Sequence, residues 1–217
     1  MSPRPSLQEI RKPQVLRATI EALYERGVDG IRVSDIAEGV GIHPSTVLHY
    51  IPSRERLIEE ALDFSDQSYY AELHKRVAEQ GAPVAQLRWL FHRFSHSPEK
   101  LDDWTLFMEI WVCALRQPQL RKLQQRIQRR LRSVTEDVLE QGIATGQFAA
   151  VDVEETALVL TSLMDGLGVQ RTLEDPAVPA ERMEALMLAM ASRLLDCDLL
   201  AEQDDEAGPT LSAAAGA

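Results

Sequence analysis

The stretch from Val33 to Leu57 constrains the fold more than any other part of the chain. It opens with apolar residues at steps of three and four, the spacing of one buried helical face: Val33, Ile36, Ala37 and Val40. Gly41 follows, where a helix can end in a left-handed residue without a Cβ penalty. Pro44 suits the first position of a second helix, because its missing N–H costs nothing there. Two short helices joined by such a turn are the layout of a helix-turn-helix, whose second helix enters the DNA major groove.

The same residues resemble the signature of the tetracycline-repressor (TetR) family of bacterial transcription regulators. The stretch IAEGVGIHPSTVLHYIPSRERLI carries the similarity, and the upstream VLRATIEALYERGVDG is similar to the first helix of that family. The matching positions are Ile36, Ala37, Gly41, Thr46, Tyr50, Ser53, Arg54, Glu55 and Leu57. The resemblance covers residues 10 to 60 and implies an N-terminal, DNA-binding head of three helices.

Three sites depart from the pattern of the family. His43 stands where the family usually has Ser or Thr at the cap of the reading helix. Ile31 and Arg32 precede the second helix, where Thr or Ser is frequent. Each change weakens a cap by roughly 1 kcal/mol unless another group replaces it. Leu48 stands where the family often has an aromatic residue, which removes one expected phosphate contact.

The reading helix has a polar outer face, which the resemblance assigns to DNA. We expect its hydroxyl and imidazole groups to meet bases or the sugar-phosphate backbone, and Tyr50 and Arg54 to contact phosphates. The predicted DNA-binding residues are Arg32, Ser34, Pro44, Ser45, Thr46, His49, Tyr50 and Arg54. Hydroxyl groups bond to several base edges, so these residues do not determine the operator sequence.

The net charge of −11 is unevenly distributed. Residues 1–60 hold eight Lys or Arg against nine Asp or Glu, whereas residues 61–217 hold 15 against 25. Because the N-terminal part is near neutral, we expect local and strongly salt-dependent attraction to phosphates, to which Arg4, Arg11 and Lys12 could add. Repulsion by the acidic remainder should weaken binding to random DNA.

Apolar periodicity and breaker residues predict an all-α chain of about nine helices. The expected domains are a helix-turn-helix domain over 1–52 with a flexible arm at 1–9, an effector-binding and dimerisation domain over 53–200, and a disordered tail over 201–217. The helices are expected near 13–26, 33–50 (two helices), 54–78, 84–94, 101–115, 120–142, 153–172 and 180–195.

The segment from Trp104 to Gly168 looks like the ligand-binding body of many members of the family. The helices near 153–172 and 180–195 are apolar over a wide arc, which favours burial on two sides and a two-fold homodimer. Such a dimer would place two reading helices on a palindromic operator. A mostly apolar effector pocket is predicted among Trp89, Trp104, Phe107, Met108, Trp111, Met164 and Gln170, with Glu109 and Asp165 as further polar candidates. For each of these residues a purely structural place in the core is an alternative interpretation.

The sequence predicts neither an enzyme nor a membrane protein. It contains no Ser-His-Asp, Cys-His or phosphate-loop arrangement and no long apolar run, and its two cysteines indicate a reducing, cytoplasmic setting. No cofactor or metal is expected, since His74, His92 and His96 are scattered along the chain. The favoured function is a one-component repressor that a small effector releases from DNA. The alternatives are a DNA-binding regulator controlled by a partner protein, and a helical enzyme that uses the helix-turn-helix only structurally.

Overall fold

The computed structural model describes residues 7–96 and 99–200, with side chains over 12–96 and 104–200. Over these ranges the chain forms helices and loops without strands, which confirms the all-α prediction. The helices are α1 (Leu7–Arg26), α2 (Val33–Gly39), α3 (Pro44–Tyr50), α4 (Arg54–Ala78), α5 (Pro83–His96), α6 (Glu99–Arg116), α7 (Pro118–Ala144), α8 (Val153–Thr172) and α9 (Ala180–Leu195). The tail predicted over 201–217, Arg4 and the side chain of Arg11 lie outside the described residues. The arm predicted over 1–9 is too long, because α1 begins at Leu7.

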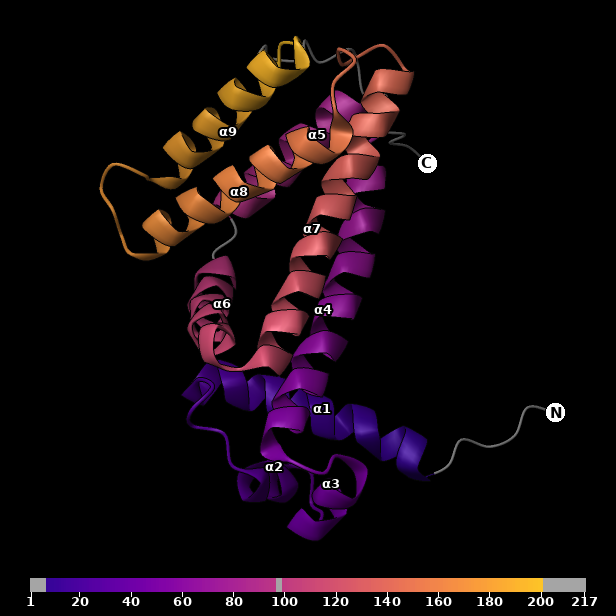
Figure 1. The fold of residues 1–217 in the computed structure, drawn as a ribbon, viewed down its shortest axis with the longest axis vertical. Helices are drawn as coiled ribbons and strands as arrows, with labels where there is room; N and C mark the ends of the chain where they lie inside the picture. Colours follow the sequence, from indigo (N-terminus) through magenta and orange to yellow (C-terminus); the bar gives the residue numbers. More distant parts are fainter. Residues whose placement is uncertain (1–6, 97–98, 201–217) are drawn as a thin grey trace, which may run out of the picture.

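The head consists of α1, α2 and α3 and lies at the lower end of the molecule (Figure 1). Its small core is formed by Leu23, Ile36, Ala37, Val47 and Ile51, each at most 3% exposed. The positive φ angle of Gly41 lets the chain turn sharply between α2 and α3, as the sequence predicts.

Helix α4 connects the head to the body and runs beside α7 over most of the height of the molecule (Figure 1). The hydroxyl of Ser53 caps it by accepting a hydrogen bond from the Arg56 N–H at 3.1 Å. With 25 residues it spans about 37 Å. Both ends of α4 agree with the sequence prediction, because the Ser53 cap precedes its start and Gly81 and Pro83 follow its end.

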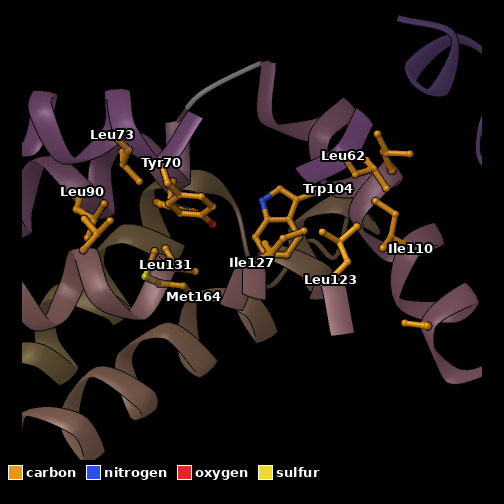
Figure 2. Packing of buried hydrophobic residues seen from close by; sticks show 14 of the residues in the cluster. Leu62, Tyr70, Leu73, Leu90, Trp104, Ile110, Leu123, Ile127, Leu131 and Met164 are labelled. Carbon is orange, nitrogen blue, oxygen red and sulfur yellow. The ribbon is translucent and has the colours of Figure 1, made fainter. Parts of the chain in front are cut away.

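The body core lies where α4, α5, α6, α7 and α8 meet, with α9 outside them against α5 and α8. Figure 2 shows Tyr70 of α4 facing Leu131 of α7 and Met164 of α8, while Trp104 of α6 lies over Ile127 of α7. None of the described helices has both the length and the apolar character needed to cross a membrane.

Helices α8 and α9 lie antiparallel at the upper side of the body, and their bounds match the predicted ones (Figure 1). One face of the pair packs inward through fully buried residues such as Leu160, Met164, Met183 and Met187. Large apolar side chains of both helices are also exposed, namely Leu158, Val159, Leu186 and Met190. Single exposed apolar residues are ordinary, but four on two neighbouring helices are more than chance exposure of the core requires.

Candidate DNA-reading surface and body cavity

The reading helix α3 is anchored by one apolar residue and capped by an unusual one. Val47 is fully buried against the head core, which fixes the rotation of the helix. The Nδ1 atom of His43 accepts a hydrogen bond from the Ser45 N–H at 3.2 Å and lies 2.8 Å from the Ser45 hydroxyl. The imidazole ring of His43 therefore takes the place of the Ser or Thr hydroxyl as the cap of α3. Arg32, in contrast, makes no side-chain cap to α2, as the sequence predicts.

Most of the predicted DNA-binding residues share the outer surface of α2 and α3. Arg32, Ser34, Ser45 and His49 are exposed, while Pro44, Thr46 and Tyr50 are half-buried. The rings of His49 and Tyr50 meet edge to face with centroids 5.7 Å apart, so each restricts the position of the other. Leu48, which replaces the usual aromatic residue, is also exposed on this helix. The two hydroxyl groups and the imidazole of Ser34, Ser45 and His49 are therefore accessible to solvent.

Arg54 does not point freely to solvent, unlike the expectation of a phosphate contact. Its Nε atom donates to the Ile31 carbonyl at 2.9 Å, and its Nη2 atom donates to the Val28 carbonyl. Nη1 and the second N–H of Nη2 remain for a phosphate, and Nη1 lies 3.8 Å from the Glu55 carboxylate. The main contact of Arg54 thus ties the start of α4 to the loop between α1 and α2.

The loop between α1 and α2 also forms a hydrogen bond with the body. The Val28 N–H donates to Oε2 of Glu109, in α6, at 2.9 Å. Gly27 precedes it with a positive φ angle, and a Cβ there would lie 2.6 Å from the same carboxylate oxygen. Val28 is therefore bonded through its N–H to α6 and through its carbonyl to α4. Glu109, predicted as a polar group of the pocket, serves instead as a head–body contact.

A cavity of ≈ 220 Å³ lies in the body next to the head. Its walls come from six helices, and α4 and α6 contribute most of them. The lining residues are Ile20, Tyr24, Leu62, Ser65, Asp66, Tyr69, Tyr70, Phe94, Trp104, Leu106, Phe107, Ile110, Ile127, Leu131 and Asp165. Six of these residues are aromatic, and the two carboxyl groups come from opposite walls, α4 and α8.

The two carboxyl groups of the cavity differ in their partners. Asp66 forms an ion pair with Arg130 of α7, whereas Asp165 accepts one hydrogen bond, at 2.8 Å, from the Gln128 amide. Burial raises the pKa of each to about 6, although Arg130 and Gln128 oppose the shift. The positive charge of Arg132 also favours the ionised form of Asp165, but the group that bonds to this half-buried carboxylate is neutral, so Asp165 lacks the direct ion pair that Asp66 has. Asp165 is therefore the group of this cavity that a cationic molecule would stabilise most.

The structure places only part of the predicted pocket at this cavity. Trp104 and Phe107 line it and meet edge to face at 5.6 Å, and Asp165 lines it as well. The other predicted residues do not line it: Trp89, Met108, Trp111, Met164 and Gln170.

The predicted pocket residues that do not line the cavity have other neighbours. Trp89 lies under the guanidinium of Arg93, and Trp111 packs on Phe107 at 5.2 Å. Met164 is fully buried core, and Gln170 is exposed, with its amide 3.4 Å from the Gly166 carbonyl.

The sequence analysis predicts no pocket residue on α4, although α4 forms much of the cavity wall. One signal was present in the sequence: Asp66 interrupts a helical stripe that continues through Tyr69 and Tyr70 at steps of three and four. An acidic residue within an apolar stripe is a reason to suspect a binding site.

The position of Trp104 depends on a glycine in the facing helix. A Cβ on Gly168 of α8 would lie 2.3 Å from the indole Cζ2 atom of Trp104. Only glycine lets the indole pack this closely, so the pair fixes one wall of the cavity.

Two of the three histidines expected to be scattered are brought together. His92 and His96 lie one turn apart on α5, with stacked rings at a centroid distance of 4.5 Å. Both face Glu184 of α9, with His92 Nδ1 3.2 Å and His96 Nε2 2.7 Å from its carboxylate oxygens. His74 is elsewhere, paired with Asp137 at 3.3 Å.

Comparison with known proteins places the head and the body in one family. Residues 15–61 match the bacterial regulatory proteins of the tetR family, and residues 83–196 match the C-terminal region of BetI-type transcriptional repressors. The HTH-type transcriptional regulator BetI of Escherichia coli strain K12 is 26% identical over 202 residues, covering 90% of this chain and 100% of that protein.

Solved structures share the fold. A putative transcriptional regulator from Saccharomonospora viridis, in complex with choline, has a TM-score of 0.73 and 20% identity, covering 86% of this chain and 97% of its own. The transcriptional regulator FadR from Bacillus subtilis, in complex with stearoyl-CoA, has a TM-score of 0.66 and 17% identity, covering 82% and 96%.

Proposed function

The chain belongs to the TetR family of transcriptional regulators, and we propose that it is a repressor released from a palindromic operator by a small organic cation. The observation that carries the choice of effector is the cavity, where aromatic rings surround the carboxylate of Asp165. Aromatic faces with a carboxylate are the chemistry that binds quaternary ammonium groups. A structural relative is in complex with choline, which carries a quaternary ammonium group.

Size favours the same class of effector. A cavity of ≈ 220 Å³ is smaller than the roughly 300–1,000 Å³ of sites for drug-sized ligands. It suits a compact cation better than a long acyl chain such as the one in the FadR complex. The presence of a lined cavity also disfavours the alternative in which only a partner protein controls the regulator.

We assign DNA recognition to the surface of α2 and α3. Ser45, Thr46 and His49 are the candidates for base or sugar contacts, and Tyr50 is the candidate for a phosphate. Two chains joined through the exposed apolar faces of α8 and α9 would present two such surfaces to a palindrome. In this assignment the protein acts by binding, in the cytoplasm, without catalysis.

Val28 supplies the proposed link between effector and DNA. The helices that hold it, α4 and α6, also form most of the cavity wall. A cation drawn toward Asp165 would move these walls and thereby the loop that positions α2. Linkage then requires that operator DNA weaken effector binding by the same factor as effector weakens DNA binding.

The first test is selection of genomic fragments by the full chain at physiological salt, with Thr46→Ala/Tyr50→Ala as the control. We expect a few palindromic fragments, lost in the control by about 100-fold, because each base or phosphate contact is worth roughly 1–3 kcal/mol. Equal enrichment by the parent and the control would refute the assignment of α3.

The second test is calorimetric titration with choline and with its neutral isostere 3,3-dimethylbutan-1-ol. Choline should bind at least about tenfold more tightly than the isostere, and Asp165→Asn should remove most of the difference. Choline should also lower operator affinity. Equal affinities for both compounds, or no binding of either, would reject an organic cation while leaving DNA recognition intact.

A further inference from the structure

We propose that His92, His96 and Glu184 form a site for a divalent transition-metal ion that joins α5 to α9. This site is separate from the cavity and from the DNA-reading surface, and it does not depend on the proposed effector. One nitrogen of each ring and one oxygen of the carboxylate all lie within 4.8 Å of one another.

The backbone presents the three groups together. Residues four apart on a helix share one face, so α5 directs both imidazoles toward α9. The rings are nearly parallel, with planes inclined by 20°, and each is turned to a different oxygen of the same carboxylate. Two imidazoles and one carboxylate are the protein ligands of many zinc sites that keep a fourth position open.

The spacing needs only side-chain adjustment to accept an ion. Metal bonds of about 2.0–2.1 Å in a tetrahedral site place ligand atoms about 3.3 Å apart. The observed hydrogen-bond distances of 3.2 and 2.7 Å lie near or below this value, and all the ligand atoms lie within 4.8 Å of one another. His92 is 60% exposed, so its ring can rotate without disturbing the core, and water can fill the open position.

The chemistry of the three groups also favours a transition-metal ion. A divalent ion bound by two neutral imidazoles and one carboxylate satisfies all three groups. Imidazole-rich sites select Zn²⁺, Ni²⁺ or Cu²⁺ over Mg²⁺, which prefers oxygen ligands.

The test is titration of the untagged, EDTA-treated full chain with Zn²⁺, followed by calorimetry and by thermal unfolding. We expect one Zn²⁺ per chain and a rise in Tm of about 5 °C at saturating Zn²⁺, because the ion cross-links two helices. Mg²⁺ at the same concentration should cause no rise.

Variants decide whether these residues are the ligands. His96→Gln and Glu184→Gln should each weaken Zn²⁺ binding at least tenfold, whereas His74→Gln, which alters another half-exposed histidine–carboxylate pair, should not. Circular dichroism in EDTA verifies that all variants fold. Substitution with Co²⁺ should give the visible absorption of a four-coordinate site in the parent and in His74→Gln only. Equal Zn²⁺ affinity in all variants, or no stoichiometric binding by the folded parent, would overturn the proposal.

Discussion

The polar side chains of the head and of the body cavity differ in their exposure to solvent. In the head, Ser45, His49 and Arg32 lie at the surface, where water satisfies them until a phosphate or base replaces it. In the body, Asp165 lies beside an apolar cavity with one neutral hydrogen-bond partner. Water therefore satisfies the polar groups of the head at little cost in free energy, whereas partial burial of Asp165 has an electrostatic cost that a bound cation would lower. Affinity for DNA is then mainly a matter of surface charge, and affinity for the effector is mainly a matter of burial.

The largest effect should come from filling the space between Trp104 and α8. Gly168→Ala places a methyl group where the indole lies, so the indole must shift into the cavity. We expect a loss of about 2–3 kcal/mol in the free energy of unfolding and at least a tenfold loss in choline affinity. Urea denaturation and calorimetry measure the two quantities.

Gly166→Ala is the matched control, because a Cβ at that position of the same helix meets nothing within 4 Å on this chain. It should raise helix stability by about 0.5–1 kcal/mol. Size-exclusion chromatography of both variants separates loss of the cavity from loss of a dimer. If the two alanine variants had the same stability and choline affinity, the close packing of Trp104 would not shape the cavity.

The next effect concerns the charge of Asp165. Its pKa of about 6 in the folded protein is above the ordinary value of 3.8, so folding favours the protonated form. This group's contribution to stability is present below pH 3.8 and is lost as the pH rises through 6. Asp165→Asn, which never ionises, should therefore be more stable than the parent by about 1–3 kcal/mol at pH 8.

Urea denaturation between pH 4 and 8 measures that difference, which should nearly vanish at the acid end. Choline should reverse it at pH 8, because the ionised parent alone can pair with the cation. A stability difference that stayed constant over this range would show that Asp165 does not titrate between folded and unfolded states as inferred.

The two regions also differ in what their sequences revealed, for a physical reason. The helix bounds of α2, α3 and α4 follow from local signals such as Gly41, Pro44 and the Ser53 cap, which act within one turn. The cavity depends on which faces of α4, α6 and α8 meet, and the sequence does not show this. The prediction from aromatic content that Trp89 and Trp111 line the pocket is therefore wrong. Likewise, Glu184 is 88 positions from His96, and only the packing of α5 on α9 brings them together.

A smaller effect should appear at the contact between the regions. Glu109→Ala removes the acceptor for the Val28 N–H, so the hydrogen bond that Arg54 donates to the Val28 carbonyl must hold this residue without the contact to α6. We expect choline and operator DNA each to bind within about threefold of the parent. The factor by which choline weakens operator binding should fall about fivefold, which corresponds to roughly 1 kcal/mol of coupling.

Fluorescence anisotropy of labelled operator, with and without saturating choline, gives that factor. Lys75→Ala, which removes an exposed 3.8 Å ion pair at the far end of α4, is the control and should leave the factor unchanged. An unchanged factor in Glu109→Ala would place the coupling in other contacts between α4 and the head.

The smallest effect tests the unusual cap of the reading helix. His43→Ala leaves the Ser45 N–H without its imidazole acceptor, so the free energy of unfolding should fall by about 0.5–1 kcal/mol. His43→Ser should retain most of the stability, because its hydroxyl can accept the same bond. Thermal unfolding of the parent and of both variants at pH 8 measures these differences. If all three proteins unfolded at the same temperature at pH 8, the imidazole would not stabilise α3, and the head would tolerate an uncapped reading helix.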